Sequence, residues 1–302
     1  MKTIGITGGT GFIGRHIAKL LIDKGYHVVI FTRNPNSTKA NSNLRYAYWN
    51  PQKQEADTSI LQTLDGIIHL AGEGVADKRW TAQRKKAILE SRTKGTAFLV
   101  QLIEQHAPNC KVFVGASAIG YYGPDRGNQS FTEDNPPYDD FLADTCRQWE
   151  AASEPLAIRR VIIRTGIVLG KDGGAFPKFE QPTRFGIYPK LGGGKQILSW
   201  IHIDDLATLY VYAIEHEHMH GAYNAVAPAP VSQKLLMYTI AHFKNFPPLG
   251  IPVPASILKL MLGEMSIEVL KSATVSSTKT VASGFTFQYT TISKAVQQLL
   301  SK

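Results

Sequence analysis

A glycine-rich turn close to the N-terminus limits the folds open to this chain more than any other feature. The sequence TGGTGFIG spaces Gly8, Gly11 and Gly14 evenly, directly after a short apolar run and directly before an amphipathic stretch. Gly8 permits a tight turn, Gly11 lets backbone approach a pyrophosphate, and Gly14 lets the following helix pack closely. That helix begins with unpaired N–H groups and the positive end of its dipole, which attract phosphates. The turn therefore predicts a dinucleotide site with contacts from Gly8, Thr10, Gly11, Phe12, Ile13 and Gly14.

The first two thirds of the chain alternate between short apolar runs and amphipathic stretches, a pattern typical of a parallel sheet covered on both faces. The predicted strands are Lys2–Thr7, His27–Thr32, Tyr46–Trp49, Gly66–Leu70, Lys111–Ala116 and Arg160–Arg164. The predicted helices are Phe12–Lys24, Thr81–His106 and Phe141–Leu156. Because crossovers between parallel strands are right-handed, these elements predict an α/β fold with a doubly wound Rossmann sheet.

The alternation of apolar runs and amphipathic stretches ends at about residue 170, after which glycines and prolines interrupt the sequence. Strand and helix patterns return at Ser199–His216 and at Ala222–Val226. We expect residues 1–168, together with about 197–227, to form the NAD(P)-binding Rossmann domain. Residues 169–196 and 228–302 are then expected to form a smaller, partly interrupted substrate lobe that ends in helices.

The residues after the second predicted strand indicate which dinucleotide is bound. An NAD-selective site places Asp or Glu about 20 residues after the glycine turn, where the carboxylate accepts hydrogen bonds from the ribose hydroxyls. Here the strand ends in Thr32, Arg33 and Asn34, without a carboxylate. A guanidinium binds a phosphate through two parallel hydrogen bonds, whereas a carboxylate repels it. Contacts from Thr32 and Arg33 therefore favour NADP(H) over NAD(H).

Charge, hydropathy and cysteine content limit the partners, the compartment and the metal content that we expect. The net charge of +9 comes from scattered basic residues and does not by itself identify a partner. We expect a small-molecule substrate and no nucleic acid. No apolar run approaches the roughly 20 residues needed to span a bilayer, and the first apolar stretch is too short for a signal peptide. We therefore expect a cytoplasmic protein without a membrane partner. Cys110 and Cys146 match no metal-ligand spacing, so no metal is expected, while a homodimer stays open as an assembly.

Several motifs together resemble one protein family over essentially the whole chain. The turn TGGTGFIG, the run HLAG and the segment SWIHIDDLA resemble the extended short-chain dehydrogenase/reductases. Other stretches resemble one atypical branch of that family, often labelled the epimerase family and frequently described as NAD(P)-dependent epimerase or dehydratase proteins. These stretches are AGEGVADKRWTAQRKKAILESRTKGT, SAIGYYG, RTGIVLGKDGG and LGEMSIEVLKSATVSSTK, followed by GFTF. The resemblance implies that Leu70, Ala71 and Gly72 run beside the adenosine and ribose, with Arg92 as a second basic contact to the cofactor.

The resemblance also directs attention to proton transfer. Enzymes of this family usually use a Tyr hydroxyl, a Lys four residues later and a Ser or Thr that holds the substrate oxygen. Ser117 matches the hydroxyl position, whereas the helix FLADTCRQWE contains neither Tyr nor Lys. Three interpretations remain open at this point. Tyr121 or Tyr122 supplies the phenol, unless both merely pack; Asp144, His202 or a residue of the substrate lobe supplies the acid; or no proton transfer occurs.

Three functions are compatible with these observations. The first is an NADP(H)-dependent oxidoreductase of the atypical extended short-chain type, acting on a small carbonyl or hydroxyl compound. The loop LGGGKQ, with Lys195 and Gln196, suits an anionic group on that compound, although a plain surface loop is equally compatible. The second is a nucleotide-sugar epimerase or dehydratase, and the third is a non-catalytic protein that senses NADP(H).

Overall fold

A computed structural model describes residues 2–37, 42–185, 187–244 and 249–301, and within them an eight-stranded sheet forms the centre of the molecule. The strand order is β13-β7-β6-β5-β1-β2-β3-β4, with every pair parallel except β3 and β4. The order reverses between β1 and β5, which creates a crevice at the carboxyl ends of these two strands. The strands are β1 (Thr3–Thr7), β2 (His27–Thr32), β3 (Leu44–Asn50), β4 (Glu55–Ala56), β5 (Gly66–His69), β6 (Val112–Ala118), β7 (Arg159–Thr165) and β13 (Gly221–Ala225).

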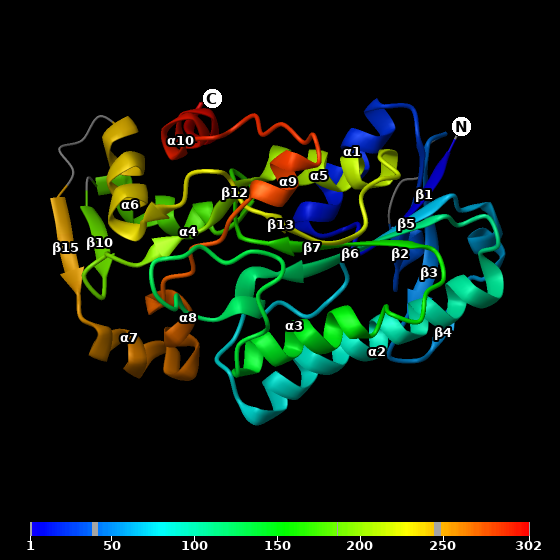
Figure 1. Cartoon of the computed structure of the whole chain (residues 1–302), viewed down its shortest axis with the longest axis horizontal. Helices are drawn as coiled ribbons and strands as arrows, with labels where there is room; N and C mark the ends of the chain where they lie inside the picture. Colours follow the sequence, from blue (N-terminus) through cyan, green and yellow to red (C-terminus); the bar gives the residue numbers. More distant parts are fainter. Residues whose placement is uncertain (1, 38–41, 186, 245–248, 302) are drawn as a thin grey trace.

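Helices cover both faces of this sheet. Helices α1 (Phe12–Asp23) and α5 (Ile203–Glu215) lie together on one face, and α2 (Ala82–His106) and α3 (Phe141–Ala151) lie on the other, as Figure 1 shows. The alternation within β2 explains this arrangement. Val28 and Ile30 pack into the core beneath α1, while Val29 and Phe31 pack into the core beneath α2. A strand that is buried on both faces contains a nearly continuous run of apolar residues, which is the pattern of His27–Thr32.

The expected doubly wound Rossmann fold is confirmed. The strand predicted at His27–Thr32 has those bounds, and the other predicted strands and helices overlap the observed ones. The short strand β4, which pairs antiparallel with the end of β3, was not predicted. Among the described residues, no helix is both long and apolar enough to cross a membrane.

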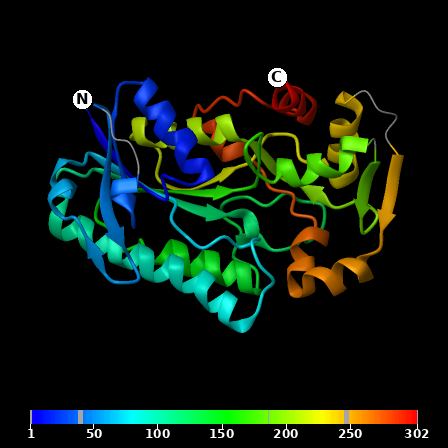
Figure 2. The same cartoon turned by 180° about the vertical axis from the view of Figure 1, so that it is seen from behind.

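A second group of elements, named here the C-terminal lobe, packs at one end of the sheet (Figure 2). Its core joins residues of α4, α6 and α10, including Phe176, Leu236, Ile240 and Val296. Small sheets pair β12 with β8 and β9, β11 with β14, and β10 with β15. The strands are β8 (Ile167–Gly170), β9 (Gly173–Gly174), β10 (Ile187–Leu191), β11 (Ile197–Leu198), β12 (Trp200–His202), β14 (Val231–Ser232) and β15 (Leu249–Val253). The helices are α4 (Phe176–Glu180), α6 (Gln233–Phe243), α7 (Ala255–Leu262), α8 (Ser266–Leu270), α9 (Thr278–Ala282) and α10 (Ile292–Leu300).

The start of α5 ties the end of the chain to the Rossmann sheet. The side chain of His202 caps α5 by accepting a hydrogen bond from the Asp204 N–H. The carboxylate of Asp205 is 2% exposed and accepts hydrogen bonds from the N–H groups of Gln288 and Tyr289. These bonds hold the segment before α10 against α5, which brings the C-terminal lobe close to the sheet.

Candidate functional site

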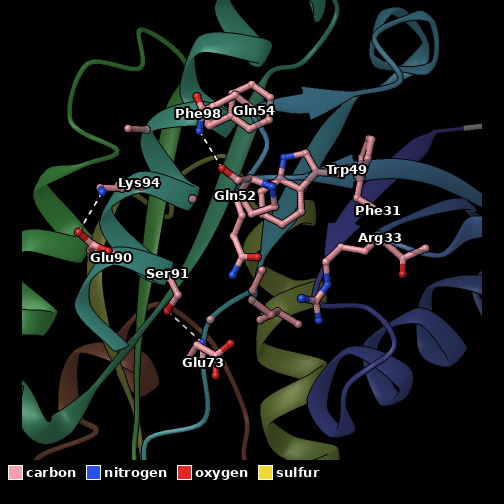
Figure 3. A pocket seen from close by; sticks show the side chains of 18 of the residues that line it. Phe31, Arg33, Trp49, Gln52, Gln54, Glu73, Glu90, Ser91, Lys94 and Phe98 are labelled. Carbon is pink, nitrogen blue, oxygen red and sulfur yellow. Dashed lines mark hydrogen bonds and ion pairs between the residues drawn. The ribbon is translucent and has the colours of Figure 1, made fainter. Parts of the chain in front are cut away.

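A cavity of about 1010 Å³ opens at the reversal of strand order, where the carboxyl ends of β1, β2, β3 and β5 meet α2. Ligands of open α/β sheets bind at such a point. Figure 3 shows Phe31, Arg33 and Trp49 on one side of the cavity and Glu73, Glu90, Ser91 and Lys94 on the other. The described lining residues that the sequence singled out are Gly8, Thr10, Gly11, Thr32, Arg33, Leu70, Ala71 and Gly72.

The glycine turn forms the base of the cavity. Gly8 has a φ of +69°, in the region that favours glycine, and a Cβ there would lie 3.0 Å from the backbone nitrogen of Ala71. A Cβ on Gly14 would lie 2.4 Å from the Gly8 carbonyl oxygen, so Gly14 lets α1 pack on the turn itself. Helix α1 begins after Gly11 without a side-chain cap. Its first N–H groups are therefore available to a phosphate.

Phe12 and Ile13 begin α1 with their side chains directed to different surroundings. The ring of Phe12 packs beside Gly173, where a Cβ would lie 2.4 Å from a ring carbon. Ile13 is partly buried against the main core. Both side chains hold the start of α1 in place, and it is the backbone of these residues that suits an anionic ligand.

A buried histidine supports the wall of the cavity that Leu70, Ala71 and Gly72 form. His69 lies at the end of β5 and is fully buried between two hydroxyl groups, with Nδ1 2.6 Å from Thr7 Oγ1 and Nε2 2.9 Å from Thr96 Oγ1. Thr7 Oγ1 also accepts a hydrogen bond from the Ala71 N–H. The histidine thus links β1, β5 and α2 directly behind the cavity-lining residues Leu70, Ala71 and Gly72. Burial, and secondarily the charge of Arg92, lowers the pKa of His69 to about 3.

His69 is expected to make the fold sensitive to acid. Its pKa is about 3 in the folded state and 6.5 in a model peptide, so the unfolded state binds more protons between these values. The free energy of unfolding therefore falls as pH drops through this window, by up to about 1.4 kcal/mol per pH unit from this residue. His69→Gln should show a shallower fall between pH 6.5 and 4.5 in urea denaturation. The exposed His220→Gln is the control, and parallel curves for H69Q and the native chain would contradict the assignment.

Arg33 lies at the end of β2 and extends into the cavity (Figure 3). Thr32 precedes it, and its hydroxyl accepts a hydrogen bond from the Asn34 N–H, which shapes the turn after the strand. The acidic lining residues lie on the other wall, where each has a basic partner: Glu73 pairs with Arg84 and Glu90 pairs with Lys94, both at 2.9 Å. The Arg33 end of the cavity is therefore the part suited to an anionic group.

Arg92 lies behind the wall of the cavity. Its guanidinium donates hydrogen bonds to the carbonyl oxygens of Glu73 and Ile88 and lies 4.8 Å from the ring centroid of Trp149. A Cβ on Gly72 would be 3.2 Å from the guanidinium carbon. In this conformation Arg92 braces the backbone of the Gly72–Glu73 segment from behind.

Ser117 belongs to a buried polar network under α3. Its side chain is 3% exposed, and its hydroxyl donates a hydrogen bond of 2.6 Å to Glu150 Oε1. Both oxygens of Glu150 also accept hydrogen bonds of 2.9 Å from Arg164. Such a bidentate pair is the strongest form of charge-assisted hydrogen bond. Ser117 therefore faces a carboxylate that is already neutralised by Arg164.

The two tyrosines after β6 differ in exposure. Tyr122 is fully buried, and its hydroxyl donates to Asn224 and accepts from Arg164. Burial raises its pKa to about 12. Tyr121 is only partly buried, and the guanidinium carbon of Arg164 lies 3.7 Å from its ring centroid. Of the two tyrosines, Tyr121 is the one that is partly exposed.

The other candidate acids are engaged elsewhere. Asp144 pairs with Arg147 at 2.5 Å and accepts a hydrogen bond from Gln148 along the surface of α3. His202 is 1% exposed and its Nε2 lies 2.9 Å from Gln298 Oε1, in addition to its role as a helix cap.

In the loop LGGGKQ, Lys195 is exposed, whereas Gln196 is buried and donates to the carbonyl oxygens of Leu191 and Val269.

Sequence reasoning missed two parts of the site. It did not single out Glu150, because an acidic residue on an amphipathic helix gives no sign of which partner it meets. It also missed that the segment Trp49–Gln54, the end of β3 with the turn that follows, forms one wall of the cavity. The Asn50-Pro51 pair directly after the third strand was an available signal for that turn.

Comparisons with known proteins agree with this architecture. Residues 4–225 match the NAD dependent epimerase/dehydratase family, and residues 253–299 match a domain of unknown function, DUF1731. The epimerase family protein YfhF of Bacillus subtilis (strain 168) is 37% identical over 302 residues, covering 99% of this chain and 98% of its own length. The epimerase family protein SAR0825 of Staphylococcus aureus (strain MRSA252) is 37% identical over 307 residues, covering 100% of both chains.

Solved structures of other proteins are similar to this chain over nearly its whole length. The human epimerase family protein SDR39U1 (isoform 2), whose crystal structure is described as with NADPH, has a TM-score of 0.86 and 28% identity, covering 98% of each chain. A nucleoside-diphosphate sugar epimerase from Corynebacterium glutamicum has a TM-score of 0.78 and 32% identity, covering 99% of this chain and 58% of its own. Sequence and structure thus agree that this chain belongs to the NAD dependent epimerase/dehydratase family, with a C-terminal DUF1731 domain.

Proposed function

We propose that the chain is an NADP(H)-dependent oxidoreductase that acts on a small carbonyl or hydroxyl compound. The observation that carries this proposal is the cavity at the reversal of strand order, with a glycine turn at its base and Arg33 at one end. The bound nicotinamide would supply the hydride chemistry. The residues of the chain bind the phosphates, hold the ring in place and provide a proton donor.

The lining residues fit the parts of such a cofactor. The first N–H groups of α1, from Phe12 to Gly14, would bind the pyrophosphate, since no side chain caps this end of the helix. Leu70, Ala71 and Gly72 line the cavity and would run along the adenosine and ribose. Arg92 acts on the cofactor indirectly in this proposal, because it holds the Gly72–Glu73 backbone that forms the wall.

Arg33 supports the preference for the phosphorylated cofactor. Its guanidinium lies at the end of β2, where dinucleotide-binding folds meet the adenosine ribose. The crystal structure of the human epimerase family protein described as with NADPH, 28% identical to this chain, points the same way.

Arg33→Ala is expected to weaken NADPH binding by about 10- to 100-fold, or about 1.4–2.7 kcal/mol, and to leave NADH binding unchanged. The reason is that only NADPH carries the 2′-phosphate that the guanidinium would bind. Calorimetric titration of the cofactor-free protein with each dinucleotide measures both affinities. Arg45→Ala removes the same charge from an exposed position of β3 that is not part of the cavity lining, and it serves as the control. Equal affinities of the native chain for NADPH and NADH would reject the preference for NADP(H).

We assign the proton donor to Tyr121. It follows β6 at the carboxyl edge of the sheet and is partly exposed, whereas Ser117 and Tyr122 are buried and joined to Arg164 or Glu150. In this proposal Ser117 and Tyr122 act as positioning residues. Ser117 holds Glu150 and Tyr122 holds Arg164, and Arg164 in turn packs on the ring of Tyr121.

An epimerase or dehydratase of nucleotide sugars is the second candidate, favoured by the description of the family. Such an enzyme returns the hydride to the oxidised intermediate that gives its product, so it causes no net change in NADPH. An oxidoreductase instead changes the nicotinamide absorbance as substrate turns over, lowering it when a carbonyl is reduced by NADPH and raising it when a hydroxyl is oxidised by NADP⁺. The helix α3 lacks the Tyr and Lys on which the family usually relies, and this counts against the second candidate. The absence of this Tyr and Lys is also compatible with a non-catalytic protein that senses NADP(H). Hydride transfer from the cofactor to any physiological compound would exclude such a sensor.

A further inference from the structure

The exposed large apolar side chains of this chain gather in the C-terminal lobe. All of those that the structure describes belong to this lobe, and all but Val281 lie between residues 187 and 267. Single apolar residues on a surface are ordinary, whereas a group of them marks a surface that binds something. The elements that carry them are β10, β15, α6, α7 and α8.

The two-stranded sheet of β10 and β15 has one apolar face exposed. Its other face carries Tyr188, which packs against α6. The register of the two strands places Ile187 beside Leu249, one position before Tyr188. Because successive residues of a strand point to opposite faces, Ile187, Leu249 and Ile251 lie on the face away from α6, where each is exposed.

Helix α7 follows β15 directly and is apolar around most of its circumference. Leu258 is buried, whereas Ile257, Leu260 and Met261 share one side of the helix and are exposed, Leu260 by 79% and Met261 by 69%. A surface helix normally presents polar residues on its outer side, but here Lys259 is the single charged residue of the helix. In both views β15 and α7 lie together, at the end of the molecule away from β2 and β3 (Figure 1 and Figure 2).

The charges around these elements are of one sign. Residues 181–203, which contain β10, and residues 227–263, which contain α6, β15 and α7, include no Asp or Glu. The basic residues of the same two stretches are Arg184, Lys190, Lys195, Lys234, Lys244 and Lys259. The acids that follow α7, Glu264 and Glu268, pair with Lys85 and Lys271. Exposed aliphatic side chains are therefore combined here with an excess of positive charge.

We propose that the C-terminal lobe binds the surface of a membrane that contains anionic phospholipids. The residues that enter the membrane, named here the insertion face, are Ile187, Leu249, Ile251, Ile257, Leu260 and Met261. Aliphatic side chains of this kind enter the boundary between headgroups and acyl chains, and lysines beside them attract anionic headgroups. The protein lies on the membrane without crossing it, and the proposal does not depend on cofactor binding. It revises the expectation of no membrane partner, which rested on the absence of a spanning segment.

The chemistry of the insertion face argues against two other occupants. Two copies of the chain joined through this face would bring the lysines of both together, without acids from the same stretches to neutralise them. Protein interfaces are enriched in Trp, Tyr and Arg and depleted in Lys, whereas the insertion face consists of Ile, Leu and Met beside Lys259. A fluid anionic surface fits this composition and needs no matching shape.

Sedimentation with large unilamellar vesicles tests the proposal on the full chain. At low salt the native chain should bind vesicles of phosphatidylcholine and phosphatidylglycerol at least about tenfold more strongly than vesicles of phosphatidylcholine alone. Leu260→Ser/Met261→Ser should lower the partition coefficient about tenfold or more, because two aliphatic side chains no longer enter the bilayer. Lys259→Glu should weaken binding about tenfold at low salt and much less at high salt, where the charges are screened.

Val281→Ser is the matched control, because it makes a similar change at an exposed position of α9 outside the insertion face. It should bind vesicles as the native chain does. All these side chains are exposed, so thermal scans should give melting temperatures within about 2 °C of the native value. Absence of binding by the native chain, or native binding by L260S/M261S, would overturn the proposal. A native dimer that L260S/M261S converts to a monomer in sedimentation velocity would also overturn it and assign the face to a second copy.

Discussion

Glu150→Ala is expected to lower the free energy of unfolding by about 3–5 kcal/mol, because it leaves the guanidinium of Arg164 buried without its counter-charge. The side chain of Arg164 is 5% exposed and that of Glu150 is 14% exposed, so water cannot replace the lost carboxylate effectively. The substitution also removes the acceptor of the Ser117 hydroxyl. Urea denaturation at neutral pH measures the loss.

Two further variants separate the ion pair from a general effect of the substitution. Glu154→Ala makes the same change at an exposed position shortly after α3 and should alter stability by less than about 0.5 kcal/mol. In E150A/R164M, both charges are absent, and part of the lost stability should return because no buried charge remains unpaired. A loss below about 1 kcal/mol in E150A would show that Arg164 finds another partner or water, and the network would then contribute little.

Gly14→Ala is expected to weaken NADPH binding by about 100-fold or more, or at least about 2.7 kcal/mol. A Cβ on Gly14 would lie 2.4 Å from the Gly8 carbonyl oxygen and 2.6 Å from Gly9 Cα, so the turn and α1 must move apart. This movement displaces the N–H groups that would bind the pyrophosphate. Overlap of this kind also destabilises a protein by roughly 1–3 kcal/mol, so the variant should remain folded but melt earlier.

Gly11→Ala is expected to weaken NADPH binding with little effect on stability, in contrast to Gly14→Ala. Gly11 has a φ of −75°, and a Cβ there would contact only the Gly8 carbonyl oxygen, at 3.2 Å. This variant should keep close to native stability yet bind NADPH more weakly, because the methyl group stands between the backbone and the phosphates. Lys19→Ala, on an exposed part of α1, should change neither property. If G14A bound NADPH with native affinity, the glycine turn could not be the phosphate site.

The sequence was most informative where local pattern and tertiary role coincide. The run His27–Thr32 had to be buried on both faces, and the turn from Gly8 to Gly14 had to join a strand to a helix. Both are short-range properties, so the Rossmann fold and the base of the cavity followed from the sequence alone. Arg33 was likewise found by its position after the second strand, and the structure places it at the cavity.

Partners from distant parts of the chain were beyond the reach of sequence patterns. Ser117 and Glu150 lie on different elements, and the family resemblance suggested a substrate oxygen, not Glu150, as the partner of Ser117. The resemblance also suggested a cofactor contact for Arg92, whose guanidinium is bonded in this structure to the carbonyl oxygens of Glu73 and Ile88. In each case the direction of a polar side chain depends on which acceptor lies within hydrogen-bond distance after folding.

The sequence by itself determined the parallel sheet, the two helical layers and the glycine turn, because these depend on apolar periodicity and on glycine at defined positions. Only the tertiary structure decided which residues line the cavity and which polar groups are already paired. It brought the Trp49–Gln54 segment against Gly95, and it buried Ser117 beside Glu150 and Arg164. The physical reason is that hydrogen bonds and contact distances are set by packing between elements, which local sequence does not specify.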